Sequence, residues 1–297
     1  MTGSVVDPEL FDASFLAQLD RLALATKRAL AGDLQGERRS PRRGASVEFA
    51  DFKAYVPGDD FRQIDWNLYA RLDRFFLKLF MAEEELTIHF LLDTSRSMDW
   101  GQPNKLRYAK RVTGAVGYIA LSNLDRVTLT AFGQSGVIEM PLQRTKQGAV
   151  PLFRFLQGLQ PGSQTDFAEV GRRYARTARN PGPLLLCTDL LDAEWQAGLQ
   201  ALLRRRFEIT LLHLLAPEEI EPSIDGDLRL MDAEGGLPVD LTADPDLLTR
   251  YYTSLTNWRD EISTFCSSRS IAYVPVTTSL PIETLLLHLM RQRGILH

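Results

Sequence analysis

The sequence lacks the features by which several protein classes are recognised. Its two cysteines, Cys187 and Cys266, are too few for a disulfide framework or for a structural zinc site. No segment approaches the roughly 20 consecutive apolar residues that a membrane-spanning helix requires, and residues 1–14 are acidic without an apolar signal core. These absences predict a soluble, cytoplasmic protein that does not insert into a membrane.

An excess of positive charge is also missing. The formal net charge is −4, so neither a nucleic acid nor an anionic membrane surface is predicted as a partner. Hydrophobic residues make up 44% of the chain, which is enough for a packed core and excludes a wholly disordered protein. The basic cluster within Arg38–Arg43 lies in a stretch marked by proline and glycine, and we expect a solvent-exposed loop there.

Familiar enzyme motifs are absent as well. The chain has no H-E-x-x-H, no paired C-x-x-C, no Walker loop and no G-x-S-x-G. His89 and His213 lie in apolar segments and are predicted to be core residues, and Cys187 is predicted to be an inert buried thiol. No such motif therefore marks an active site.

Short apolar runs alternate with amphipathic segments over most of the chain. Runs such as 183–189 are typical of strands buried on both faces of a parallel sheet. Alternating strands and helices indicate right-handed crossovers, so we predict an α/β fold with a doubly wound, mostly parallel sheet flanked by helices. The predicted strands are 86–93, 127–132, 137–140, 183–189, 207–215 and 271–276, and the predicted helices are 11–31, 105–122, 149–159, 167–178, 192–205, 246–268 and 282–291. A β-hairpin insertion at about 226–242, turning at Gly235–Gly236, interrupts the alternation.

Polar clusters fall where predicted strands end. The first strand ends in the run Asp93–Ser97, the fourth ends in Thr188-Asp189, and the segment 162–166 opens the helix at 167. Loops at the carboxyl ends of parallel strands meet at one edge of a sheet, which is where ligands bind. We therefore expect these three clusters to lie together.

The donors in these clusters suit a metal ion. They comprise two carboxylates and three hydroxyls, from Asp93, Ser95, Ser97, Thr165 and Asp189. All are oxygen donors, which a hard divalent cation such as Mg²⁺ prefers. Because hydroxyl ligands carry no charge, the ion would stay electrophilic towards a carboxylate from another molecule.

Helix capping is the alternative interpretation of the same residues. Asp93 and Ser95 are residue types that cap helices, and Thr165 or Asp166 could cap the helix at 167. We favour the metal site, because capping alone would require three separate loops to supply matching ligands by chance.

The three clusters resemble the metal-ion-dependent adhesion site (MIDAS) of von Willebrand factor type A domains. This resemblance implies that Ser95 and Ser97 are direct ligands and that Thr165 is a third. It also implies that Asp93 and Asp189 act mainly through bound waters, and that an acidic residue of a partner completes the shell. The ion expected is Mg²⁺, with Mn²⁺ or Ca²⁺ as alternatives.

The preceding segment resembles the signature of the domain of unknown function 58 (DUF58) family, which precedes a von Willebrand A domain. The resemblance is carried by Gly44–Phe49, by Pro57-Gly58-Asp59-Asp60 and by Arg62, Ile64-Asp65-Trp66 and Ala70-Arg71. We therefore expect residues 1–85 to form an N-terminal extension packed on a von Willebrand A-like domain at 86–297. Asp60, Asp65, Arg62 and Arg71 are expected to form a buried ion network, with Trp66 against an arginine, that docks the extension.

Three functions are consistent with these observations. The family resemblance implies a non-enzymatic adaptor or co-chaperone of a MoxR-type AAA+ ATPase, acting on an unknown client protein. An alternative is a metal-dependent phosphohydrolase with Asp93 as nucleophile. Such an enzyme needs a second carboxylate two residues on as its acid/base, but that position is Ser95. It also needs a lysine after a later strand to hold the phosphoryl group, but no lysine follows Lys146. The third is a metal-free scaffold. We predict the adaptor, because no general base or nucleophile lies beside the clusters.

Overall fold

The computed structural model describes residues 10–33, 49–57, 59–80, 86–134, 136–162, 166–224, 226–231 and 238–291. These residues form two compact units. The first contains the N-terminal helix and everything from residue 86 onwards, and the second contains residues 49–80. The predicted loop at Arg38–Arg43 lies outside the described residues.

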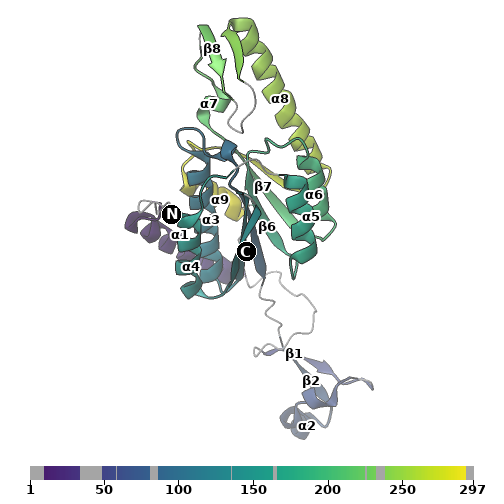
Figure 1. Cartoon of the computed structure of the whole chain (residues 1–297). Helices are drawn as coiled ribbons and strands as arrows, with labels where there is room; N and C mark the ends of the chain where they lie inside the picture. The colour runs from purple at the N-terminus through teal and green to yellow at the C-terminus, as the bar shows by residue number, and fades with distance from the viewer. Residues whose placement is uncertain are drawn as a thin grey trace. The chain divides into compact units, whose positions relative to one another are not determined.

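A six-stranded sheet organises the first unit (Figure 1). Its strand order is β10-β7-β6-β3-β4-β5, and every neighbouring pair is parallel except β4 with β5. The strands are β3 (Thr87–Asp93), β4 (Arg126–Gln134), β5 (Gly136–Gln143), β6 (Pro183–Thr188), β7 (Glu208–Leu215) and β10 (Ala272–Thr277). The predicted fold class, α/β with a mostly parallel sheet, is confirmed. Every residue of β3 and β6 is buried, as their unbroken apolar runs indicate.

Helices cover both faces of this sheet, and each face has its own hydrophobic core. One core joins α1 (Ala13–Asp33), α3 (Lys105–Ser122), α4 (Ala149–Gly158) and α9 (Ile282–Arg291) to the sheet. The other joins α5 (Phe167–Thr177), α6 (Trp195–Leu203) and the C-terminal part of α8 (Pro245–Ser267). Figure 1 shows α1, α3 and α4 on one side of the strands and α5 and α6 on the other. The predicted two-sided layering is therefore present.

Helix α1 belongs to the first unit, although the sequence analysis placed it in the N-terminal extension. Phe15 and Leu19 are 2% and 0% exposed and lie in the core that contains α3 and α4. The Arg111 guanidinium lies 4.4 Å from the centre of the Phe15 ring. At the surface, Asp20 accepts hydrogen bonds from the Tyr118 hydroxyl and from the Lys146 ammonium. The sequence thus predicted the helix itself, but not what it covers.

An arm projects beyond the carboxyl ends of the parallel strands. It contains α7 (Pro217–Ile220), the hairpin of β8 (Gly226–Leu230) and β9 (Val239–Ala243), and the N-terminal part of α8 (Figure 1). The buried residues of α8 begin only at Ile262, beyond Trp258, whose ring packs against His213. The predicted insertion at 226–242 is confirmed as a hairpin, and its turn at Gly235–Gly236 lies outside the described residues.

The second unit is small and consists of one hairpin and short helices. Strands β1 (Phe49–Ala54) and β2 (Phe76–Phe80) pair antiparallel, and α2 (Trp66–Leu72) lies between them in the chain. Asp65 caps α2 by accepting from the amides of Asn67 and Leu68, and it also pairs with Lys78 at 3.2 Å. Lys53 pairs with Asp59 at 2.9 Å.

The ion network expected in this unit differs from the one observed. The expected partners of Asp65 were Arg62 and Arg71, but both arginines are exposed and the observed partner is Lys78. Trp66 is 62% exposed and contacts the rings of Tyr69 and Phe75 edge-on. The sequence could not predict this, because Lys78 lies on β2, which only the hairpin brings next to Asp65. Docking of this unit on the sheet stays a prediction.

Candidate metal site

The D-x-S-x-S run folds into a tight loop directly after β3. Asp93 Oδ1 accepts a hydrogen bond from the Ser95 amide at 2.8 Å, which turns the chain back on itself. The hydroxyl oxygens of Ser95 and Ser97 are then 3.0 Å apart. Arg96 between them is exposed. The loop therefore brings the alternate side chains of the run together, as the sequence predicts.

The end of β4 is hydrogen-bonded to this loop. Both the amide and the hydroxyl of Thr94 donate to the carbonyl of Phe132, at 2.7 and 2.9 Å. The following residue, Gly133, has φ +124°, and a Cβ there would lie 2.4 Å from the Ser95 amide nitrogen. Only glycine fits such a close approach between backbones. The position of Ser95 thus depends on the glycine of the neighbouring strand.

Asp189 follows β6 and is tied to β3 through Thr188. The Thr188 hydroxyl donates to Asp93 Oδ2 at 2.7 Å and itself accepts from the Leu190 amide. Asp189 is 1% exposed, and its Oδ1 accepts from the Leu191 amide at 3.2 Å. The two aspartates that the sequence singled out are therefore held at the same edge of the sheet by neighbouring strands.

A cavity of about 420 Å³ opens where these loops meet. It is lined by Asp93, Ser95, Ser97, Phe132, Asp166, Phe167, Thr188, Asp189 and residues 190–194. Four of the five predicted ligands, Asp93, Ser95, Ser97 and Asp189, thus line one space. The fifth, Thr165, lies outside the described residues. Its described neighbour Asp166 lines the same cavity, and the Gly162 amide donates to the Thr94 carbonyl at 2.6 Å.

The capping interpretation accounts for only part of this arrangement. Asp166 does cap α5, because its carboxylate accepts from the Glu169 amide at 2.8 Å. Ser95 precedes the 3-10 turn Arg96–Met98 but makes no capping hydrogen bond with its side chain. Its hydroxyl instead contacts the Ser97 hydroxyl, so capping does not explain why the two serines point to one place.

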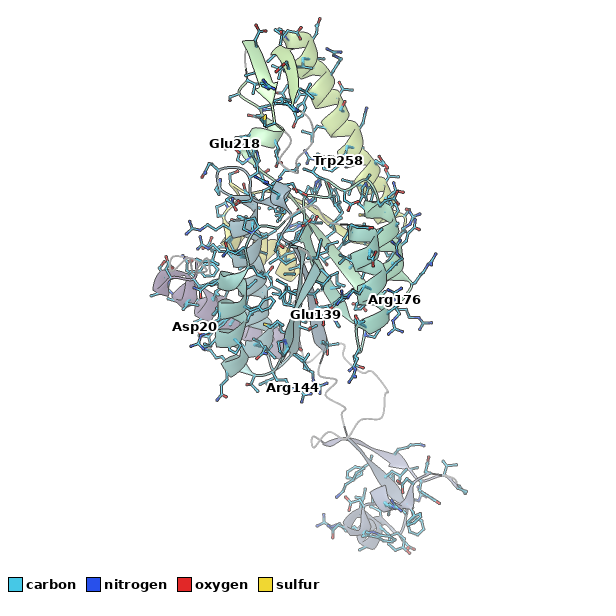
Figure 2. All side chains as sticks on the ribbon, viewed as in Figure 1. Asp20, Glu139, Arg144, Arg176, Glu218 and Trp258 are labelled. Carbon is cyan, nitrogen blue, oxygen red and sulfur yellow. The ribbon has the colours of Figure 1, made fainter. Side chains whose placement is uncertain are left out.

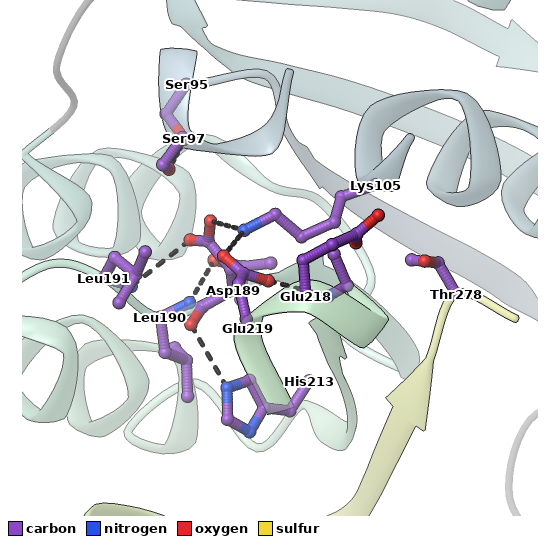
Figure 3. A network of polar contacts seen from close by, with 12 residues as sticks. Ser95, Ser97, Lys105, Asp189, Leu190, Leu191, His213, Glu218, Glu219 and Thr278 are labelled. Carbon is purple, nitrogen blue, oxygen red and sulfur yellow. Dashed lines mark hydrogen bonds and ion pairs between the residues drawn. The ribbon is translucent and has the colours of Figure 1, made fainter. Parts of the chain in front are cut away.

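A lysine that the sequence analysis did not single out completes the surroundings of Asp189. Lys105, the first residue of α3, is fully buried, and its Nζ lies 2.9 Å from Asp189 Oδ2 (Figure 3). It also lies 2.5 Å from Oε1 of Glu219 on α7. The absence of lysine after Lys146 therefore does not leave Asp189 without an ammonium group, because Lys105 reaches it from earlier in the chain. Nothing in the local sequence marks it, since a lysine at the start of an amphipathic helix is ordinarily exposed.

The electrostatics of Asp93 favour a bound cation. Burial, together with the nearby charge of Asp189, raises the pKa of the Asp93 carboxyl to about 7. A divalent cation between the two carboxylates would relieve this repulsion. Both oxygens of each carboxylate already accept hydrogen bonds, so the serine hydroxyls are the freer direct ligands. The donor set therefore fits a hard cation held through hydroxyls and water.

Within the part of the chain that the structure describes, no group of three or more His, Cys, Asp or Glu side chains could hold a metal ion. The predicted core residues His89 and His213 are 1% and 0% exposed, and burial raises the pKa of the Cys187 thiol to about 12. These residues are structural, as the sequence predicts. None of the described helices is both long and apolar enough to span a bilayer.

Comparison with protein families gives one match that covers most of the chain. Residues 51–261 match the model described as "Protein of unknown function DUF58". The uncharacterized protein Rv1480 of Mycobacterium tuberculosis is 26% identical over 253 residues, which is 83% of this chain and 78% of the relative. An uncharacterized protein of Mycobacterium bovis, Mb1516, is similar to the same extent.

Two of the similar solved structures align with about two thirds of this chain. The hypothetical protein BatB from Bacteroides thetaiotaomicron is 18% identical, with a TM-score of 0.45 over 69% of this chain and 96% of its own. The SpRpn10 VWA domain is 13% identical, with a TM-score of 0.42 over 69% of this chain and 94% of its own.

Proposed function

This chain belongs to the domain of unknown function 58 (DUF58) family, and from that premise we propose that it is a non-enzymatic protein-interaction module. The module holds a divalent cation at the carboxyl edge of its sheet and uses it to bind an acidic side chain of another protein. Asp93, Ser95, Ser97 and Asp189 hold the ion, with Thr165 as the expected third hydroxyl. Mg²⁺ is the expected ion, with Mn²⁺ or Ca²⁺ as substitutes.

The observation that carries this proposal is the meeting of two serine hydroxyls and two buried carboxylates in one open cavity. The hydroxyls of Ser95 and Ser97 are 3.0 Å apart, next to carboxylates that are otherwise hydrogen-bonded. An ion held mainly by neutral ligands keeps a strong affinity for an incoming anion. Leu191, 55% exposed at the rim of the cavity, offers an apolar contact beside it. An acidic residue with an apolar neighbour is therefore the expected binding element of the partner.

The partner expected from the family resemblance is a MoxR-type AAA+ ATPase. In this role the chain acts as adaptor or co-chaperone during the assembly of an unknown client protein. A phosphohydrolase has weaker support, because the Lys105 ammonium is fully buried and already paired with two carboxylates. Such a lysine is poorly placed to contact a phosphoryl group that enters from the cavity.

Isothermal titration of the full chain with MgCl₂, MnCl₂ and CaCl₂ after EDTA treatment tests the site. We expect one ion per chain for the wild type and at least tenfold weaker binding for the Ser95→Ala, Ser97→Ala double variant. Ser267→Ala is the control, because that hydroxyl lies on the exposed side of α8 and donates to a backbone carbonyl. A wild type that binds none of the three ions would leave the metal-free scaffold as the better description.

The interaction itself is tested with the MoxR-type ATPase from the same genome. We expect binding to the purified chain in Mg²⁺, and loss of binding in EDTA or with Asp93→Ala. Binding that is equal in all three conditions would separate the interaction from the metal site. Turnover of a general phosphatase substrate by the wild type, lost in Asp93→Ala, would instead establish the enzyme.

A further inference from the structure

Lys105 is a fully buried cation placed behind the proposed metal site. Its side chain is 0% exposed, and it enters from α3, whereas the predicted ligands come from the loops after β3 and β6. A lysine is almost never fully buried unless it is paired. Here it is paired twice, with Asp189 at 2.9 Å and with Glu219 at 2.5 Å (Figure 3).

Two carboxylates therefore share one ammonium group. Each is also held by one backbone amide, since Asp189 accepts from Leu191 and Glu219 Oε2 accepts from Ala216 at 2.7 Å. Asp189 is one of the proposed ligands, whereas Glu219 lies on α7. The ammonium is thus a single positive charge between the ion-binding loops and the first turn of the arm.

Helix α7 is tied to its surroundings at several further points. The Tyr251 hydroxyl on α8 donates to the Glu219 carbonyl, and the Gln102 amide donates to the Glu218 carboxylate at 3.2 Å. Glu218 is labelled in Figure 2, at the base of the arm. A Cβ on Gly101 (φ +88°) would lie 2.2 Å from the Cβ of Ala216, the residue before α7, so this loop is in direct contact with the start of that helix. Any change in the pairing of Lys105 therefore acts on the segment from which the arm begins.

We propose that Lys105 is a positioning residue that couples occupancy of the cation site to α7. This inference rests on the proposed function, because it needs an ion near Asp189. Without the ion, the Lys105 ammonium offsets part of the charge of Asp189. A divalent cation near the same carboxylate competes for its charge and repels the ammonium, whose remaining partner is Glu219. Ion binding thus strengthens the Lys105–Glu219 contact and holds α7 more firmly.

The coupling is reciprocal, because linked equilibria affect one another equally. Glu219 draws the ammonium towards α7 and so favours ion binding at Asp189. A partner that binds the arm and stabilises α7 would therefore raise the affinity of the site for the ion. The bound ion would in turn raise the affinity of the arm for the partner. The partner's acidic residue and its contact with the arm would then be recognised together.

A double-mutant cycle on the full chain tests the coupling. Mg²⁺ affinity is measured by calorimetry for the wild type, Glu219→Gln, Lys105→Met and the double variant. We expect Glu219→Gln to weaken Mg²⁺ binding by about fivefold or more, because Lys105 then pairs with Asp189 alone. In the Lys105→Met background the same change should alter affinity less than twofold. Glu221→Gln, an exposed position in the same segment, is the control and should leave affinity unchanged.

Amide hydrogen exchange at residues 218–221 is the second measurement. We expect Mg²⁺ to slow exchange there in the wild type and to have little effect in Glu219→Gln, so the test does not depend on whether Lys105→Met folds. If the wild type binds Mg²⁺, but Glu219→Gln binds it equally well and exchange is unaffected, the coupling is overturned and the proposed function stands. If the wild type binds no divalent cation, the proposed function fails and takes the coupling with it.

Discussion

The backbones of Gly133 and Ser95 lie so close together that a Cβ added to Gly133 would clash with Ser95. A Cβ on Gly133 would be 2.4 Å from the Ser95 amide nitrogen and 2.6 Å from the Thr94 carbonyl carbon. The contact joins the end of β4 to the loop that carries the proposed ligands. Because both sides of the contact are backbone, neither can rotate away.

Gly133→Ala is expected to displace the serine loop. The substitution adds a clash and forces alanine into a φ of +124°, so we expect a loss of about 2–4 kcal/mol in the free energy of unfolding. The affinity for Mg²⁺ should fall as well, because the serine loop is displaced. Urea denaturation with and without Mg²⁺ measures both effects. Gly158→Ala is the control, since a Cβ there meets nothing within 4 Å, and equal stability of the two variants would contradict the close contact.

Asp93→Asn is expected to stabilise the protein when metal is absent. The pKa of Asp93 is raised to about 7 by burial and by the charge of Asp189, so at pH 8 the folded protein holds an unfavourable carboxylate. The amide removes that charge while it can still accept from the Ser95 amide. We expect about 1–3 kcal/mol of added stability in EDTA at pH 8, and no further gain from Mg²⁺.

The pH dependence of this effect has a defined sign. The raised pKa means that the folded wild type takes up a proton below pH 7 that the unfolded chain takes up only near 3.8. Wild-type stability therefore gains from Asp93 as the pH falls from about 7 to 4, and the variant lacks this gain. Asp260→Asn, at an exposed site on α8, should leave the profile unchanged. A stability advantage of Asp93→Asn that persists undiminished at pH 4 would refute the argument.

Protonation of His213 is expected to destabilise the folded protein at acid pH. Burial lowers the pKa of its imidazole to about 4, while the unfolded side chain protonates near 6.5. The neutral ring therefore contributes stability above pH 6.5, which is lost as the pH falls towards 4, by up to about 3 kcal/mol. Burial lowers the pKa of His89 as well and acts in the same direction.

The contribution of His213 is measured in the Asp93→Asn background, where the opposing carboxylate is gone. We expect the free energy of unfolding to decline between pH 6.5 and 4.5, and His213→Gln to make this decline shallower. Nitrogen chemical shifts of the His213 ring should report a neutral imidazole at pH 5.5. A protonated ring at that pH would mean that the site is more open to water than its 0% exposure indicates.

Helix α1 is expected to be essential to the first unit. Phe15 is 2% exposed in the core with α3 and α4, so Phe15→Ala should lower the free energy of unfolding by about 3–5 kcal/mol. Leu24, on the same helix, is 59% exposed, and Leu24→Ala should change it by about 0.5 kcal/mol or less. Thermal unfolding of both variants measures this, and equal effects would mean that α1 does not contribute to the core.

The fold and the ligand loops could be predicted from the sequence because their signals are local. The apolar run that ends at Asp93 indicates a buried parallel strand, and parallel strands bring their carboxyl ends to one edge. From this alone Asp93, Ser95, Ser97 and Asp189 are expected together, and the cavity contains all four. Their role as metal ligands stays a prediction.

Lys105 and Glu219 could not be predicted, for a physical reason. Lys105 lies 84 residues before Asp189 and 114 before Glu219 in the sequence. Its burial depends on how α3 and α7 pack against the sheet edge, and hydrophobic periodicity carries no information on that packing. The same applies to α1, whose apolar stripe predicts a helix but does not identify the surface that it covers.

The arrangement of the first unit also limits how the chain can be shortened. The family match begins at residue 51 and ends at residue 261, whereas the core reaches from Leu10, just before α1, to Leu289 on α9. A fragment trimmed to the matched residues would lose both outer helices and the edge strand β10, and would expose Leu212 and Leu214 to solvent. Expression of the isolated family region is therefore expected to yield aggregates, and recombinant work should retain both termini.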